Sequence, residues 1–520
     1  MVQASEKLML RFQVFHNGEA PAELDLNFAY LVGSDSVPIR GEMAYVDGEI
    51  RCRKRPAGPA ALALMWKVHN FGAIMLATVR LPERGQPYVL NVELARNRMM
   101  RLLQKREDWG LLDISEAQAV NQKFNEARDL LIAAMENLEN PPEAAKFADK
   151  CLAIALPASE QTASVHAELL LHRRISTRAF PKNVFGCAAA PERSDDSYRR
   201  KLVATGEFIY LPMKWKFMEP QEQTFNAAPM DNWVEYLRQS KLPIAAGPLV
   251  HFTESAIPDW LYIWEHDYET VRGLLYEHIE RVVRRYGPNV VLWNVLSGLH
   301  VNSHFSFTFD QLMDLTRMAI TLVKKLMPNA RTMIEITQPW GEYYAKNQRS
   351  IPPMIYAEMA VQSGIPFDIF GLQLCFGAPR DGGWQRDLFQ VSAALDRFAA
   401  LGKPVIISRM SIPSGVTEKN AAAGTWRKPW NDQLQSKWLE AMVNIILSKP
   451  FVEAITWDDI VDSDGGSTPG SGLLTAELTA KPAMQTWLAM RRAVNSVRQS
   501  GSKSSGGAGA VVADSTGTTG

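Results

Sequence analysis

The chain has 520 residues, with 56 basic and 56 acidic side chains and therefore no formal net charge. This length suggests several domains, and the balanced charge argues against a nucleic acid as the main partner, because phosphate binding usually needs a basic excess. The composition is that of a globular protein with one departure, a content of 14 tryptophans. Excess tryptophan can belong to a core, but it also forms surfaces that stack on sugar rings.

The cysteines and the first residues indicate the compartment. Four cysteines are widely spaced without a metal-ligand pattern, and we expect them to be small buried side chains. The N-terminal stretch carries Glu6, Lys7 and Arg11 and lacks the apolar run of a secretion signal. The sequence contains no run of 18 apolar residues, so no membrane-spanning helix is predicted. We expect a cytoplasmic protein with no membrane partner, or a secreted one if the start codon is assigned wrongly.

Residues 1–110 read as a β-rich module. Short apolar runs, from LRFQVF to YVLNVEL, are separated by turn sequences such as HNGEAP and PERGQP. This pattern predicts a sandwich or jelly-roll.

Residues 111–178 change to a helical period and predict a connector between modules. A helix is expected to begin near Ser115, a candidate cap, and to end at Pro141-Pro142. A second helix is expected over about 160–172.

Residues 179–495 contain eight short apolar runs, from VFGCAAA to EAITW, which alternate with amphipathic stretches. This alternation predicts a (β/α)8 barrel, in which function lies at the carboxyl ends of the strands. Residues 496–520 are rich in glycine, serine and threonine, and we expect a disordered tail.

Motifs at the predicted strand ends resemble those of glycoside hydrolase family 10, the endo-1,4-beta-xylanase family. Six match in order across about 180–490, among them MKWKFMEPQEQTF, AGPLVH with PDWL, RRYGPNVVLWNVLSG, FGLQLC and GKPVIISRMSIPS. The resemblance implies hydrolysis of β-1,4-linked polysaccharide by one acid/base and one nucleophilic glutamate. The β-rich module in front looks like an accessory domain of the carbohydrate-binding-module kind.

The two catalytic positions of the family fall on residues that cannot perform its reaction. The acid/base glutamate after the fourth strand falls on Gly298, and the nucleophile on the seventh strand falls on Arg409. Glycine carries no proton donor, and arginine is a permanent cation that cannot attack an anomeric carbon. We therefore expect a divergent member without the catalytic pair. Nearby family positions also change, to Gly247, His251, Ser297 and Cys375, whereas Trp215, Gln373 and Trp457 keep the family's residue types.

Two functions of different classes remain open, and a purely structural module is a third. The first is binding of a β-linked saccharide at the barrel mouth without hydrolysis, by Trp215, His251, Trp340, Gln373, Arg409 and Trp457. The second is an active glycoside hydrolase that uses relocated carboxylates such as Glu254, Glu335 and Asp458. We expect Arg409 to have a carboxylate partner, because an unpaired buried charge is costly.

Other residues near the mouth give weaker signals. His251, His300 and His304 do not follow a metal-ligand spacing, so we expect neither a metal nor a cofactor. Six tryptophans fall in loops on the ligand face of the predicted barrel, at positions 260, 264, 340, 384, 426 and 430. We expect at least one of them to stack on sugar, and the oligomeric state stays open.

Overall fold

The C-terminal part of the protein is a closed barrel of parallel strands. The computed structural model describes residues 9–55, 58–418, 420–463 and 468–505. Each of the eight apolar runs predicted in residues 179–495 contains a strand, and strand β17 pairs with β9 to close the ring. The strands are β9 (Phe185–Ala188), β10 (Phe208–Pro212), β11 (Ile244–Gly247), β12 (Val250–His251), β13 (Val290–Ser297), β14 (Arg331–Ile336), β15 (Ile369–Cys375), β16 (Val405–Ser411) and β17 (Val452–Trp457). Strands β11 and β12 both pair with β13 and together make the third position of the (β/α)8 barrel.

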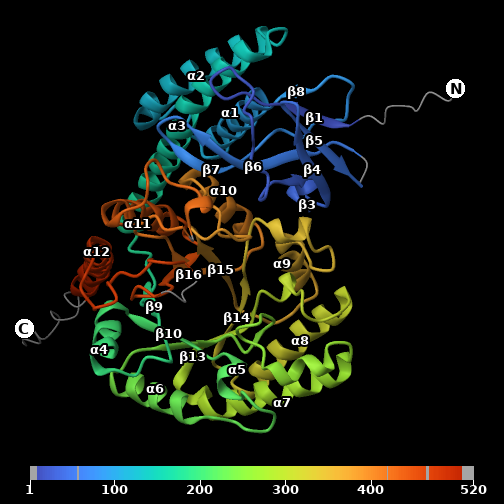
Figure 1. Ribbon diagram of the computed structural model, residues 1–520. Helices are drawn as coiled ribbons and strands as arrows, with labels where there is room; N and C mark the ends of the chain where they lie inside the picture. The colour runs from blue at the N-terminus through green and yellow to red at the C-terminus, as the bar shows by residue number, and fades with distance from the viewer. Residues whose placement is uncertain (1–8, 56–57, 419, 464–467, 506–520) are drawn as a thin grey trace, which may run out of the picture.

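Helices surround the barrel (Figure 1). They are α4 (Asp196–Thr205), α5 (Trp215–Met218), α6 (Ala228–Gln239), α7 (Tyr268–Tyr286), α8 (Phe309–Leu326), α9 (Pro353–Gln362), α10 (Leu388–Ala399), α11 (Asp432–Ser448) and α12 (Pro482–Ser505). Local sequence sets their starts, as at α8, where Thr308 and Gln311 form a capping box. Helix α12 corrects the expected tail boundary, because residues 496–505 are helical, while 506–520 lie outside the described residues.

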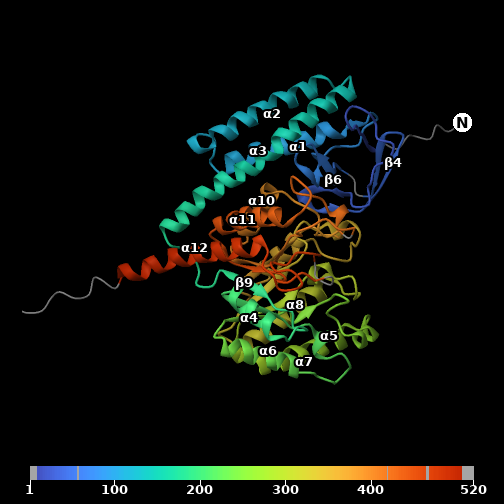
Figure 2. The same cartoon turned by 60° about the vertical axis from the view of Figure 1, so that its left-hand side comes forward.

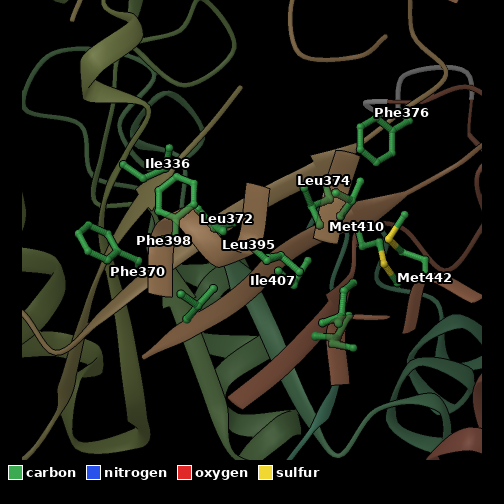
Figure 3. Packing of buried hydrophobic residues seen from close by; sticks show 14 of the residues in the cluster. Ile336, Phe370, Leu372, Leu374, Phe376, Leu395, Phe398, Ile407, Met410 and Met442 are labelled. Carbon is green, nitrogen blue, oxygen red and sulfur yellow. The ribbon is translucent and has the colours of Figure 1, made fainter. Parts of the chain in front are cut away.

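Apolar side chains of the strands pack against this helical layer (Figure 3). Phe370 and Leu372 of β15 and Ile407 of β16 meet Leu395 and Phe398 of α10 in one buried cluster. The continuous apolar runs of the sequence are what parallel strands need, because both of their faces are covered. None of the helices in the described part of the chain has the length and apolar character that a membrane crossing requires.

The N-terminal module contains two four-stranded sheets, ordered β4-β5-β1-β8 and β3-β2-β6-β7. Their strands are β1 (Leu10–Gln13), β2 (Tyr30–Val32), β3 (Pro38–Ile39), β4 (Gly41–Val46), β5 (Glu49–Lys54), β6 (Ala61–Val68), β7 (Gly72–Ala77) and β8 (Tyr88–Val89). The expected strand YVLNVEL is wrong beyond Val89, because helix α1 (Leu90–Asp108) follows. Its buried side chains, which include Leu94, Arg98 and Leu102, recur with a helical period.

The observed connector between the module and the barrel also differs from the prediction. Helix α2 (Gln118–Glu136) is followed by α3 (Pro141–Ser176), a single helix of 36 residues that contains Pro157. Pro141-Pro142 begins this helix and does not end the previous one. Proline is tolerated there because the amide groups of the first helical turn have no hydrogen-bond acceptor within the helix, so the missing N–H costs nothing. Figures 1 and 2 show α3 running from the module along the barrel, where it packs on α10 and α11.

Candidate functional site

A cavity of about 600 Å³ lies at the carboxyl ends of the barrel strands. Each of the eight strand positions contributes to its lining, with Ala188, Tyr210, His251, Ser297, Glu335, Gln373, Arg409 and Asp458 as examples. Its volume falls within the usual range for small-molecule sites, and its position is the one where barrels bind their ligands.

Arg409 and Asp458 form an ion pair in this cavity. The Arg409 Nε donates to the Asp458 carboxylate, whose side chain is 3% exposed, against 34% for Arg409. Burial alone lowers the pKa of Arg409, but Asp458, Cys375 and Glu335 raise it above its ordinary value. The carboxylate partner expected for Arg409 is therefore Asp458, and the arginine stays cationic.

Gly298 follows β13 in a left-handed conformation, with φ of 58°. A Cβ atom added to Gly298 would lie 2.8 Å from Thr337 Oγ1. The backbone amide of Gly298 donates a hydrogen bond to the Glu335 carbonyl at 3.1 Å. The conformation and the close contact both oppose any side chain at this position. The local backbone thus fits glycine and disfavours a glutamate.

Ser297 and Glu335 are buried cavity residues that each have a polar atom without a hydrogen-bond partner in the described part of the chain. Ser297 and Glu335 are each 1% exposed, and they are register neighbours on β13 and β14. Ser297 Oγ and Glu335 Oε1 find no partner among the residues that the structure describes. Because unpaired buried polar atoms cost free energy, these two atoms are suited to accept or share hydrogen bonds with a bound hydroxylated ligand or with water.

His251 and Cys375 also line the cavity, both in uncharged form at neutral pH. Burial, followed by the charges of Arg409 and Lys214, lowers the pKa of His251 to about 3. Burial raises the pKa of the Cys375 thiol to about 12, which makes it a poor nucleophile. The four cysteines are all buried and free, as the sequence predicts.

The three histidines considered for a metal site do not meet in one place. His304 lines the cavity with His251, whereas His300 is fully buried and its Nε2 lies 2.9 Å from the Thr337 carbonyl. No group of three or more His, Cys, Asp or Glu in the described chain is arranged to hold a metal ion.

Asp459 is a cavity residue that the sequence places among the carboxylates near the strand ends but not among the proposed substitutes. Burial, followed by the charge of Asp458 and then of Glu192, raises its pKa to about 6. Its carboxylate accepts hydrogen bonds from the Val461 amide and the Ser463 hydroxyl. Its position directly after strand β17 is the available signal. Of the carboxylates proposed as substitutes, Glu335 and Asp458 line the cavity, while Glu254 is exposed and outside its lining.

The tryptophans lie elsewhere than expected. Among the described residues that line the cavity there is no tryptophan. Trp215 stacks on His278 with 4.3 Å between ring centroids, and the fully buried Trp457 donates to the Ser471 carbonyl. Trp340 is half-buried, with the Arg386 guanidinium 5.0 Å from its ring. Of the other loop tryptophans, Trp384, Trp426 and Trp430 are buried and Trp260 and Trp264 are half-buried.

The fold and the cavity define a (β/α)8-barrel protein with a cavity at its carboxyl-end mouth. The chain belongs to glycosyl hydrolase family 10, whose model matches residues 175–489. It is 23% identical over 281 residues to Endo-1,4-beta-xylanase B of Thermotoga neapolitana, covering 51% of this chain and 74% of the relative.

Solved structures similar to this one include two from the same family. A GH10 structure from Paenibacillus barcinonensis is 18% identical, with a TM-score of 0.46, and the match covers 60% of this chain and 96% of the other. Xylanase 10B from Thermotoga petrophila in complex with xylobiose is 18% identical, with a TM-score of 0.45 and coverage of 63% and 97%.

Proposed function

We propose that the protein binds a β-linked saccharide in the barrel-mouth cavity and does not hydrolyse it. The observation that carries this proposal is the Arg409–Asp458 ion pair, at the position that the sequence resemblance assigns to the family's nucleophile. A fixed cation there opposes the positive charge that develops on the sugar during glycoside hydrolysis. The glycine-specific backbone at Gly298 supports the same conclusion for the acid/base position.

The polar side chains of the cavity support saccharide binding. The unpartnered Glu335 Oε1 can accept a hydrogen bond from a sugar hydroxyl, and Ser297 Oγ can donate or accept one. Gln373 and the Arg409 guanidinium add polar groups on the same wall. Because a relative is called Endo-1,4-beta-xylanase B, β-1,4-linked xylo-oligosaccharides are the first ligands to test.

Calorimetric titration with a panel of β-linked oligosaccharides tests the proposal, together with an assay for released reducing sugar. We expect binding of at least one oligosaccharide, no sugar release, and weaker binding by the Glu335→Gln variant. Glu254→Gln is the matched control, because Glu254 is exposed outside the cavity lining. Absence of binding across the panel would favour a structural role instead.

A second candidate function, hydrolysis by other carboxylates, is favoured by Asp459. Its pKa of about 6 suits a general acid, and Glu335 would be the complementary carboxylate of the cavity. Sugar release that disappears in Asp459→Asn and in Glu335→Gln, but not in Glu254→Gln, would establish this function and refute the non-hydrolytic proposal.

A further inference from the structure

One loop of the barrel belongs both to the cavity and to the contact with the N-terminal module. It connects β15 to α10 and runs from 376 to 387. Its residues Arg380, Asp381, Gly382 and Gly383 line the cavity. The next residues along the chain, 384–387, contact the N-terminal module. The cavity wall and the module contact are therefore consecutive parts of one short segment.

Trp384 is the main apolar contact of this segment with the module. Its side chain is 1% exposed, and its ring centroid lies 3.9 Å from that of Phe28. Tyr30 and Met75 of the module belong to the same buried cluster. Beside it, the Met75 amide donates to the Gln385 carbonyl at 3.1 Å. The module thus provides the pocket in which the tryptophan is held.

Two buried ion pairs hold the residues next to Trp384. Arg386 bonds Glu342 at 2.6 Å and the Tyr30 hydroxyl at 3.3 Å. Asp387, which is fully buried, bonds Arg98 of helix α1 at 2.5 Å. Removing one partner of such a pair leaves a buried charge uncompensated, so these contacts strongly favour a single loop position.

Backbone hydrogen bonds make the cavity part of the loop compact. The Gly377 amide donates to the Gly383 carbonyl at 2.8 Å, and the Gly383 amide donates to the Arg380 carbonyl at 2.9 Å. Gly382 has φ of 81°, and a Cβ there would lie 2.5 Å from Gln338 Cγ. Gly383, the neighbour of Trp384 in the chain, is therefore bonded within the part of the loop that lines the cavity.

We infer that the N-terminal module holds the wall of the ligand cavity in place, with Phe28 as a positioning residue beneath Trp384. This inference rests on the proposed function only in assuming that the cavity binds a saccharide. It gives the module a role in ligand affinity without any contact between module and ligand. The dependence of the cavity on the module can be measured with and without ligand.

The first test compares Phe28→Ala with Phe15→Ala in the full chain. Both residues are half-buried phenylalanines of the module, but only Phe28 contacts Trp384. Hydrogen–deuterium exchange of the segment 377–387 is followed without ligand. We expect exchange to rise by roughly tenfold in Phe28→Ala and to stay near that of the wild type in Phe15→Ala. Unchanged exchange in a folded Phe28→Ala protein would overturn the inference.

The second test measures the affinity for the oligosaccharide that the wild-type protein binds. We expect a loss of roughly tenfold in Phe28→Ala and recovery in the ring-conserving Phe28→Tyr. If Phe28→Ala does not fold, Phe28→Leu replaces it, with smaller effects in the same direction. Faster exchange with unchanged affinity would overturn the positioning role. If the wild type binds no saccharide, the proposed function fails, and the exchange experiment alone decides whether the module holds the wall.

Discussion

Gly298 illustrates how backbone conformation limits what a single position can do. Its left-handed φ of 58° and the 2.8 Å that would separate an added Cβ from Thr337 Oγ1 act together against any side chain. Introducing a carboxylate through Gly298→Glu would therefore need a backbone change as well. We expect Gly298→Glu combined with Arg409→Glu to release no sugar from xylan.

The first prediction separates the two costs at Gly298. Gly298→Ala should lower the free energy of unfolding by about 2 kcal/mol, through left-handed strain plus the contact with Thr337. Gly364→Ala is the matched control, because Gly364 has φ of 65° and nothing lies within 4 Å of an added Cβ. The control should cost only about 1 kcal/mol. Urea unfolding of both variants gives the comparison, and equal losses would contradict a role for Thr337.

At the scale of single elements, helix α3 is fixed to the barrel by its last turn. Arg174 is 4% exposed and donates to the carbonyls of Ala179, Leu447, Lys449 and Val452. Burial lowers the pKa of Arg174 to about 10, which leaves it charged at neutral pH. A planar fork of donors can satisfy several carbonyls at once, which a lysine cannot do.

The second prediction follows from this contact. Arg174→Met should lower the free energy of unfolding by about 3 kcal/mol, because several buried carbonyls lose their donors. Arg174→Lys should recover only part of that loss. The adjacent Arg173 is exposed, so Arg173→Met should stay within about 0.5 kcal/mol of the wild type. Chemical denaturation checks all three, and a full recovery by lysine would show that charge alone matters.

Elements with a strong local signal are the ones that the sequence predicts. The eight barrel strands are continuous apolar runs bounded by turns, and each of them is present in the structure. Helix α1 escapes prediction because its first residues, LNVEL, also alternate like a strand, and the helical period becomes clear only toward Leu102. The second helix of the connector is predicted too short because Pro157 and the paired prolines resemble helix breaks.

The sequence predicts a contact of the candidate site where a buried charge requires a partner of opposite charge. It does not predict contacts between segments that are far apart in the chain. Burial of a cation requires a carboxylate near Arg409, and Asp458 meets that requirement. The loop tryptophans, in contrast, have partners far away in the chain. Trp384 packs on Phe28, and Trp426 donates to Glu160 of α3 at 2.7 Å. No local pattern in either loop indicates these contacts.

For the whole molecule, buried histidines make stability depend on pH. Burial is the largest cause that lowers the pKa of His166, His251, His278 and His300, to about 4, 3, 3 and 4. Between these values and the ordinary 6.5, the unfolded chain binds protons that the folded chain does not. Stability should therefore rise with pH across this window and fall as the solution is acidified below about 6.5. Asp149 and Asp459, whose pKa values are raised to about 6, have the opposite effect below pH 6, because the folded chain then binds protons there that the unfolded chain does not.

The third prediction isolates one histidine of this set. The ring nitrogens of His278 have no hydrogen-bond partner in the described part of the chain, so His278→Phe removes no hydrogen bond within that part. Between pH 4 and 6 it should reduce the slope of unfolding free energy against pH by about 1.4 kcal/mol per unit. Urea unfolding across this pH range is the measurement, and an identical slope in the wild type and in His278→Phe would contradict the assignment.

The fourth prediction concerns cooperativity between the module and the barrel. One buried apolar cluster extends from Leu10 of the module to Trp487 of α12, and the Arg98–Asp387 pair crosses between the two parts. We therefore expect the full chain to unfold in a single calorimetric transition, although chains of several domains commonly show more than one. Leu10→Ala in the module and Val452→Ala in the barrel remove fully buried side-chain atoms. Each should move that one transition to lower temperature. A Leu10→Ala protein whose heat-capacity trace splits, with the barrel transition left in place, would show that the two parts unfold independently.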